Sequence, residues 1–273
     1  MTFEEGFSMK LINNKSNLFE NNVMFNTDNF NGVWTDTGGY IPDRFIPKIK
    51  KVIIADNITD IMDSMYEGFK SLKSVIISDS VLNIGKAAFY GCFNLISVSM
   101  SRNITSIGDY AFYNCIKLKD ILIPDTVTYI GNYAFSHCKD ITAIDIPNSV
   151  KHIGNFAFSN CSKLKIVNIN SGVLSIGDGA FNECNSLENI NIPDSVTHIG
   201  AYAFYDCKNL KSINIPISVT DIENRSFLKC NKLIIYTDNK KAIQYCQDNN
   251  IPVKSLKAKN ESYKPLKLRI REY

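Results

Sequence analysis

The sequence has little net charge, no long hydrophobic run and none of the common catalytic motifs. Its 30 Lys and Arg residues against 27 Asp and Glu give a formal net charge of only +3, which argues against a surface built to bind polyanions. No stretch reaches the roughly 18 consecutive apolar residues of a membrane-spanning helix. Residues 1–7 are acidic where a secretory signal is basic, so the chain as written is expected in the cytoplasm. Nucleophile elbows, Walker loops, HExxH and CxxC pairs are all missing, so we expect no catalysis, cofactor or metal.

The cysteines are too few for a small disulfide scaffold, but they are evenly spaced. Seven of the eight lie 23 residues apart, and each follows a phenylalanine by three positions. The cysteines are Cys92, Cys115, Cys138, Cys161, Cys184, Cys207 and Cys230, and the phenylalanines are Phe89, Phe112, Phe135, Phe158, Phe181, Phe204 and Phe227. An earlier unit in the same phase has Tyr66 and Phe69 in these two places, so the sequence contains eight units, of which the first and last are imperfect.

Other positions of the unit keep the same phase. Each unit has an isoleucine ahead of its aromatic residue, and in six units a glycine follows that isoleucine. The isoleucines are Ile61, Ile84, Ile107, Ile130, Ile153, Ile176, Ile199 and Ile222, and the glycines are Gly85, Gly108, Gly131, Gly154, Gly177 and Gly200. Because a unit this short cannot bury enough apolar surface alone, the repeat predicts a solenoid in which each coil is stabilised by its neighbours.

One unit shows the expected course of the chain through a coil. Residues 121–123 alternate in a way typical of a short strand, and Pro124 ends the strand because it has no amide to donate. Gly131 suits either a positive φ or a close approach between backbones. Residues 132–138 are expected to form about one helical turn with the Ala, Phe and Cys columns facing inward.

The period divides the chain into four parts. Residues 1–46 lie outside it, contain the only tryptophan, Trp34, and are expected to be an N-terminal capping segment. Residues 47–235 form the solenoid of eight repeats, and residues 236–258 form a C-terminal cap with a short helix. Residues 259–273 form a basic tail, since residues 254–273 hold seven Lys or Arg against two Glu.

The repeat resembles that of a known family. The unit Ile-Pro-x-(Ser/Thr)-Val-x-x-Ile-Gly-x-x-Ala-Phe-x-x-Cys-x-x-Leu-x-x-Ile, at residues 123–144 and again at 192–213, is similar to the BspA-type leucine-rich repeat. The resemblance implies an α/β repeat solenoid: a right-handed coil with a short-stranded parallel sheet on the concave side and short helical turns on the convex side. It also implies a binding or adhesion protein with a protein partner, at the cell surface or secreted.

The sulfur and imidazole side chains have a structural and a chemical interpretation. The thiols of the cysteine column could bind a metal or react with one another only if they converged on one point. Equal spacing instead points them all in the same direction, so we expect buried thiols that pack as small apolar groups. Cys246 lies outside the column and is expected to pack within the cap. The histidines, His137, His152 and His198, have no carboxylate placed beside them in a catalytic pattern.

The outward positions of the predicted strands are the candidate binding strip. They are Ile53, Ile76, Ser99, Leu122, Asp145, Asn168, Asn191 and Asn214. The strip is either a solvated row of side-chain ladders or a protein-docking surface on the concave sheet, with Ile76 and Leu122 as anchors and the Asn row as a polar rim. We expect a monomeric scaffold that recognises a protein through this strip. The alternative is an intracellular anchoring protein whose tail, residues 259–273, binds nucleic acid or an anionic membrane.

Overall fold

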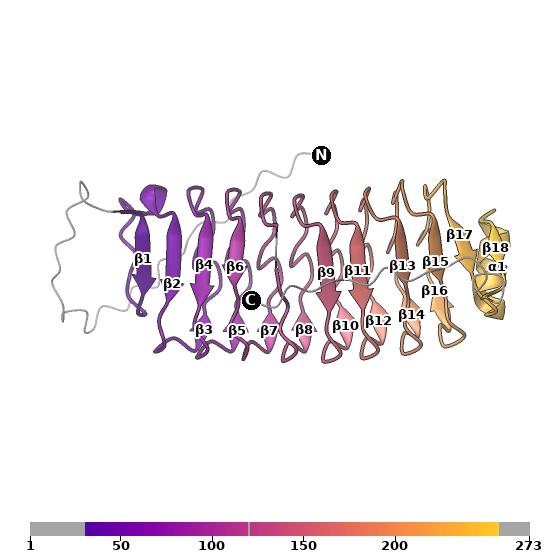
Figure 1. The fold of residues 1–273 in the computed structure, drawn as a ribbon, viewed down its shortest axis with the longest axis horizontal. Helices are drawn as coiled ribbons and strands as arrows, with labels where there is room; N and C mark the ends of the chain where they lie inside the picture. The colour runs from indigo at the N-terminus through magenta and orange to yellow at the C-terminus, as the bar shows by residue number, and fades with distance from the viewer. Residues whose placement is uncertain (1–30, 120, 257–273) are drawn as a thin grey trace. The chain divides into compact units, whose positions relative to one another are not determined.

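The chain forms a parallel β-solenoid of about eight turns. The computed structural model describes residues 31–119 and 121–256, and Figure 1 shows successive coils side by side from β1 to α1. The strands along one face have three or four residues, apart from the two-residue β18 at the end: β1 (Val33–Asp36), β2 (Lys51–Ile54), β4 (Ser74–Ile77), β6 (Ser97–Ser99), β9 (Ala143–Ile146), β11 (Ile166–Ile169), β13 (Asn189–Asn191), β15 (Ser212–Asn214), β17 (Ile234–Tyr236) and β18 (Val253–Lys254). We call these strands, with residues 121–123 between β6 and β9, the long-strand face.

A second parallel sheet follows the isoleucine column and was not expected from the sequence. Its eight strands pair in the order β16-β14-β12-β10-β8-β7-β5-β3. They are β3 (Asp60–Ile61), β5 (Asn83–Ile84), β7 (Ser106–Ile107), β8 (Tyr129–Ile130), β10 (His152–Ile153), β12 (Ser175–Ile176), β14 (His198–Ile199) and β16 (Asp221–Ile222). Each residue pairs with the one 23 positions away, as Ile153 does with Ile176, so the sequence period is also the hydrogen-bond register.

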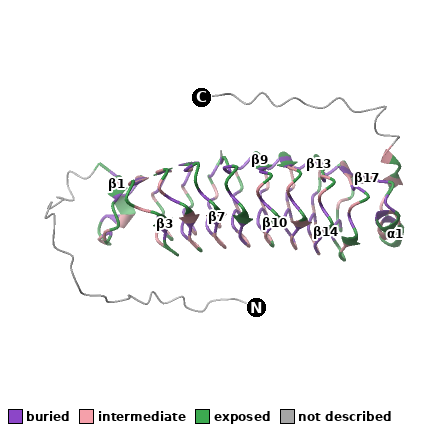
Figure 2. Cartoon of the chain, turned by 90° about the horizontal axis from the view of Figure 1, so that it is seen from below, coloured by how far each residue is buried: buried purple, intermediate pink, exposed green. Residues whose placement is uncertain are grey.

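The longer strands alternate between buried and exposed residues because one side of their sheet faces the core. In β4, Val75 and Ile77 are buried while Ile76 is exposed, and β9 and β11 repeat this pattern. The segment 121–123 keeps the same alternation, with Leu122 exposed between two buried isoleucines, but it is not assigned as a strand. In Figure 2 buried residues, in purple, recur along the coils from β1 to β17.

The helical turn expected over residues 132–138 is not formed, and the same holds in the other repeats. Instead, amides alternate between two kinds of acceptor. Ser136 N donates to Tyr133 O within its own coil at 3.1 Å, whereas His137 N donates to Ser159 O in the next coil at 2.8 Å. Tyr133 and His137 have φ of 56° and 62°, which interrupts any helix. The alternation lets each coil bond to its neighbour, which an α-helical turn would prevent by using its amides internally.

The core is a set of columns that run through the stack. The phenylalanines form a continuous ladder of nearly parallel rings, with centroids 5.2 Å apart for Phe89 and Phe112 and 5.3 Å for Phe135 and Phe158. The cysteine thiols lie against this ladder, and Cys138 Sγ donates to Phe112 O at 3.1 Å. Such contacts repeat once per coil, so the stacking of coils supplies packing that no single repeat has.

The glycine column is explained by close approach and not by a positive φ. A Cβ on Gly154 would lie 2.5 Å from the carbonyl carbon and oxygen of Gly131. No column glycine in residues 85–200 has a positive φ. The glycines therefore let two backbones meet at a distance that any side chain would prevent.

Each end of the described stack is covered by a different element. At the first coil, β1 pairs in parallel with β2, and the 3-10 helix η2 (Ile46–Lys48) leads into β2. The buried Asp36 accepts hydrogen bonds from Tyr66 Oη and from Gly38 N. At the last coil, the helix α1 (Lys240–Asp248) is capped by Asn239, and β18 returns to pair with β17.

Candidate functional site

The structure places the eight strip residues in one line across the long-strand face. Ile53, Ile76 and Ser99 are consecutive partners in the register of β2, β4 and β6, and Asn191 pairs with Asn214 further along. Leu122, Asp145, Asn168 and Asn191 are exposed, as are Ile76 and Ser99, while Ile53 and Asn214 are half-buried. The line also continues beyond the predicted residues, since Thr35 pairs with Ile53 and Tyr236 with Asn214.

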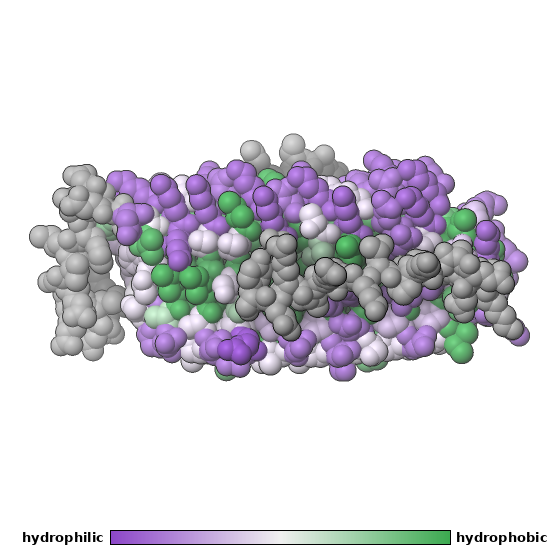
Figure 3. Space-filling view, viewed as in Figure 1, coloured by the Kyte–Doolittle hydropathy of each residue, from purple (hydrophilic) through white to green (hydrophobic). Residues whose placement is uncertain are grey.

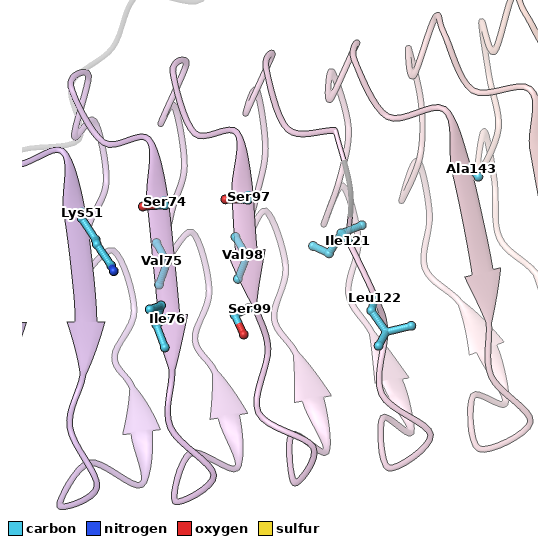
Figure 4. A pocket seen from close by; sticks show the side chains of 10 residues that line it. All are labelled: Lys51, Ser74, Val75, Ile76, Ser97, Val98, Ser99, Ile121, Leu122 and Ala143. Carbon is cyan, nitrogen blue, oxygen red and sulfur yellow. The ribbon is translucent and has the colours of Figure 1, made fainter. Parts of the chain in front are cut away.

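The first half of the strip carries an apolar hollow. Ser99 is a short side chain between two large ones, Ile76 at 39% exposure and Leu122 at 76%. The hollow has a volume of about 590 Å³ and is lined by the residues that Figure 4 shows: Lys51, Ser74, Val75, Ile76, Ser97, Val98, Ser99, Ile121, Leu122 and Ala143. In Figure 3 hydrophobic residues, in green, gather over the β2 to β6 region with hydrophilic residues on both sides of them.

The second half of the strip is polar and bonded within itself. Asn214 Nδ2 donates to Asn191 Oδ1 at 3.1 Å, and Asn170 Nδ2 donates to Asp145 Oδ1 at 2.8 Å. Beside the strip, Lys211 forms an ion pair with Glu188 at 2.7 Å. A partner that covered this half would displace existing bonds, so the apolar half is the better place for a docked side chain.

The cysteine column lies in the core and not on a surface. Cys92 to Cys207 are buried and Cys230 is half-buried. Burial raises the pKa of the Cys92 and Cys161 thiols to about 12, so these groups are protonated at neutral pH. Cys246, on the inner face of α1, is buried as well, and its pKa is raised to about 11 by burial. A protonated thiol is a poor nucleophile and a poor metal ligand, which fits the interpretation of the column as packing.

One histidine has carboxylate neighbours that the sequence analysis missed. His198 Nδ1 lies 3.0 Å from Asp221 Oδ2, and His198 Nε2 lies 3.5 Å from Glu223 Oε1. Asp221 stands 23 residues after His198, so the repeat register itself was the signal that could have revealed the contact. The three side chains are of types that bind zinc, and one ligand atom from each lies within 4.8 Å of the others, but the groups are exposed or half-buried and no second observation points to an ion there. The arrangement is a hydrogen-bonded contact between the neighbouring strands β14 and β16 at the end of the second sheet.

Other predicted features lie elsewhere. His152 Nδ1 contacts Ser175 Oγ at 2.7 Å, and His137 packs edge-on against Tyr113 with ring centroids 5.3 Å apart. Burial, followed by the charge of Lys139, lowers the pKa of His137. The tail at residues 259–273 lies outside the described residues, as do residues 1–30. Among the described residues, the helices are too short and too polar to cross a membrane.

Comparison with known proteins identifies the repeat. A model of the BspA type leucine rich repeat region matches residues 44–165 and 128–250. The leucine-rich repeat protein TpLRR of T. pallidum is 30% identical, over 59% of this chain and 78% of that chain, with a TM-score of 0.56. A leucine rich cell surface protein of Faecalibacterium prausnitzii is 21% identical, over 82% and 91% of the two chains, with a TM-score of 0.46.

The pneumococcal vaccine antigen PcpA is 14% identical, over 76% of this chain and 79% of that chain, with a TM-score of 0.38. No curated protein sequence matches the chain. The family model covers more than half of the chain, and it describes the same repeat that the cysteine, phenylalanine and glycine columns define. The chain belongs to the BspA-type leucine-rich repeat family.

Proposed function

We propose that the chain is a rigid, non-enzymatic scaffold that recognises a protein partner through the long-strand face. The observation that carries the proposal is the apolar hollow over Ser99, bounded by Ile76 on β4 and by Leu122 on the segment 121–123. Exposed apolar side chains on a soluble surface mark sites of contact when they are grouped around a hollow. Because β4 pairs with β2 on one side and β6 on the other, the backbone at Ile76 is already ordered before a partner binds, which favours affinity.

The proposal is tested by replacing both anchors with acidic residues. A quantitative pull-down compares the wild-type chain with the variant Ile76→Asp, Leu122→Asp and with Ile217→Asp, whose side chain is 78% exposed in the turn after β15. Each apolar side chain that becomes buried contributes about 1.5–3 kcal/mol, so the double variant should lose its partner by about 100-fold or more. The Ile217 variant should bind as the wild type does.

The binding protein recovered in this way is then titrated in purified form against the same three chains. Equal affinity for the wild type and the double variant would reject the long-strand face as the binding surface. A loss with both the double variant and the Ile217 variant would mean that exposed apolar residues in general, and not this hollow, hold the partner.

A further inference from the structure

A row of lysines borders the apolar hollow at the start of the strands. Lys73 N donates to Lys50 O at 2.7 Å, Ile96 N donates to Lys73 O at 2.8 Å, and Lys119 N donates to Ile96 O at 3.1 Å. These bonds place Lys50, Lys73 and Lys119 in one line on successive coils, with Ile96 in the remaining place. Lys51 itself lines the hollow.

Among the described residues, these lysines have no ion pair like the one that Lys211 makes with Glu188. No ion pair joins Lys50, Lys51, Lys73 or Lys119 to another residue of the described ranges. In the later half of the face, Lys211 occupies the same place in the repeat and is neutralised by Glu188. Lys165, in the same column of the later half, also has no ion pair among the described residues, so the half that carries the hollow differs in having several such lysines together.

Basic and acidic residues lie at opposite ends of the strands on this face. Residues 47–53, 70–76, 93–99 and 116–122 hold seven lysines and one acidic residue, Asp120, which lies outside the described residues. Beyond the ends of the same segments, Asp56, Asp79 and Asp125 are exposed. Arg102 takes the remaining place in this row and lies 3.9 Å from Asp79, so three of the four places are acidic. An acidic group on a bound molecule would be attracted to the strand starts and repelled from the strand ends, which fixes how the molecule lies.

We propose that the partner presents an acidic peptide segment with an apolar side chain, which enters the hollow over Ser99 while its carboxylates face Lys50, Lys51 and Lys73. The proposal rests on the proposed function and adds the chemistry of the partner to it. A nucleic acid would match the lysines, but it has no flexible aliphatic side chain that could fill the hollow. A membrane surface is bound by apolar side chains that project together, whereas Ile76 and Leu122 leave a hollow open between them.

The test selects peptides from a random dodecapeptide display library on the immobilised full-length chain. The enriched peptides should combine Asp or Glu with a Leu, Ile, Phe or Trp residue. Synthetic copies are then titrated by fluorescence anisotropy against the wild type, the variant Leu122→Asp, and the charge reversal Lys50→Glu, Lys73→Glu. The matched control is Lys86→Glu, Lys151→Glu, which changes the net charge equally at two exposed lysines near the second sheet.

We expect the reversal at Lys50 and Lys73 to weaken binding at least tenfold, and the control to change it less than twofold. Affinity should also fall with salt. Binding that needs Leu122 but ignores the lysines would overturn this inference and leave the proposed function standing, whereas binding that ignores Leu122 would count against both. Enriched peptides that are net basic, a library that yields no binder, or equal affinity for phosphatidylserine vesicles or single-stranded DNA would also overturn it.

Discussion

Replacing Gly154 by alanine tests the spacing of the coils directly. The new methyl group would lie 2.5 Å from two backbone atoms of Gly131 and 2.7 Å from Ile130 O. Backbone atoms inside a stack cannot turn aside as the end of a flexible side chain can, so the two coils must move apart. Ladder bonds such as Gly154 N to Ile130 O, now 3.2 Å, would weaken as a result.

The size of the effect follows from two opposing contributions. Forcing one extra methyl group into a packed site costs about 1–3 kcal/mol, and the loss of chain freedom in the unfolded state offsets about 0.4–1 kcal/mol of that. A net loss of about 1–2 kcal/mol lowers the melting temperature by roughly 2–8 °C, because a domain of this size loses about 2–4 °C per kcal/mol.

Differential scanning calorimetry of the wild type, Gly154→Ala and Gly39→Ala measures the effect. A methyl group added at Gly39 would have no atom within 4 Å, and Gly39 has no positive φ, so its substitution should leave the melting temperature within about 1 °C. If Gly154→Ala melts at the same temperature as Gly39→Ala, close approach is not the reason for the glycine column.

Three further predictions concern the thiols, the C-terminal cap and the strip. Burial raises the pKa of Cys92 and Cys161 from the ordinary thiol value of 9.0 to about 12. Their contribution to stability is complete below about pH 9. Above that pH these thiols ionise in the unfolded chain before they ionise in the folded one, so the fold loses stability. The free energy of unfolding, measured by urea titration in reducing buffer, should therefore fall above about pH 9 by about 1.4 kcal/mol per pH unit and thiol, and less steeply in Cys92→Ala, Cys161→Ala. A free energy that stays constant up to about pH 11 would contradict this. Asn239→Ala removes the cap of α1 and two buried hydrogen bonds, to Pro216 O at 3.0 Å and to Val219 O at 2.6 Å. It should lower the free energy of unfolding in urea by about 2–4 kcal/mol, whereas the exposed Asn249→Ala should lower it by less than about 0.5 kcal/mol. Leu122→Ala should be neutral within about 0.5 kcal/mol and the buried Leu118→Ala should cost about 2–5 kcal/mol, and equal losses would show that the strip is part of the core.

Much of the fold could be predicted because the repeat length, 23 residues, is also the sequence separation between residues that pair in neighbouring coils. Once residues 23 apart are partners, each buried column follows from one repeat, and the outward position of Leu122 fixes the outward position of Ile76. The contact between His198 and Asp221 was open to the same reasoning, but those residues were considered singly and not as members of one column.

The turn after the glycine column was predicted wrongly for a physical reason. Its apolar residues, such as Ala134, Phe135 and Cys138, are spaced as they would be in a helix, and burial alone does not distinguish a helix from a chain of β-turns. The choice depends on where the backbone amides find acceptors, and Phe135 N finds Ala157 O in the next coil at 2.8 Å. That acceptor exists only when the coils are already stacked.

The sequence by itself determined the repeat, the columns that enter the core and the line of residues that faces outward, because a fixed period and alternating burial leave no other solenoid register. Only the tertiary structure decided what that line forms on the surface. Ser99 lies in a hollow because Ile76 and Leu122 are on the coils beside it. Lys73 has no ion pair among the described residues because the preceding coil offers Lys50 where Lys211 has Glu188. Such properties depend on three or more coils at once, and a single repeat contains none of them.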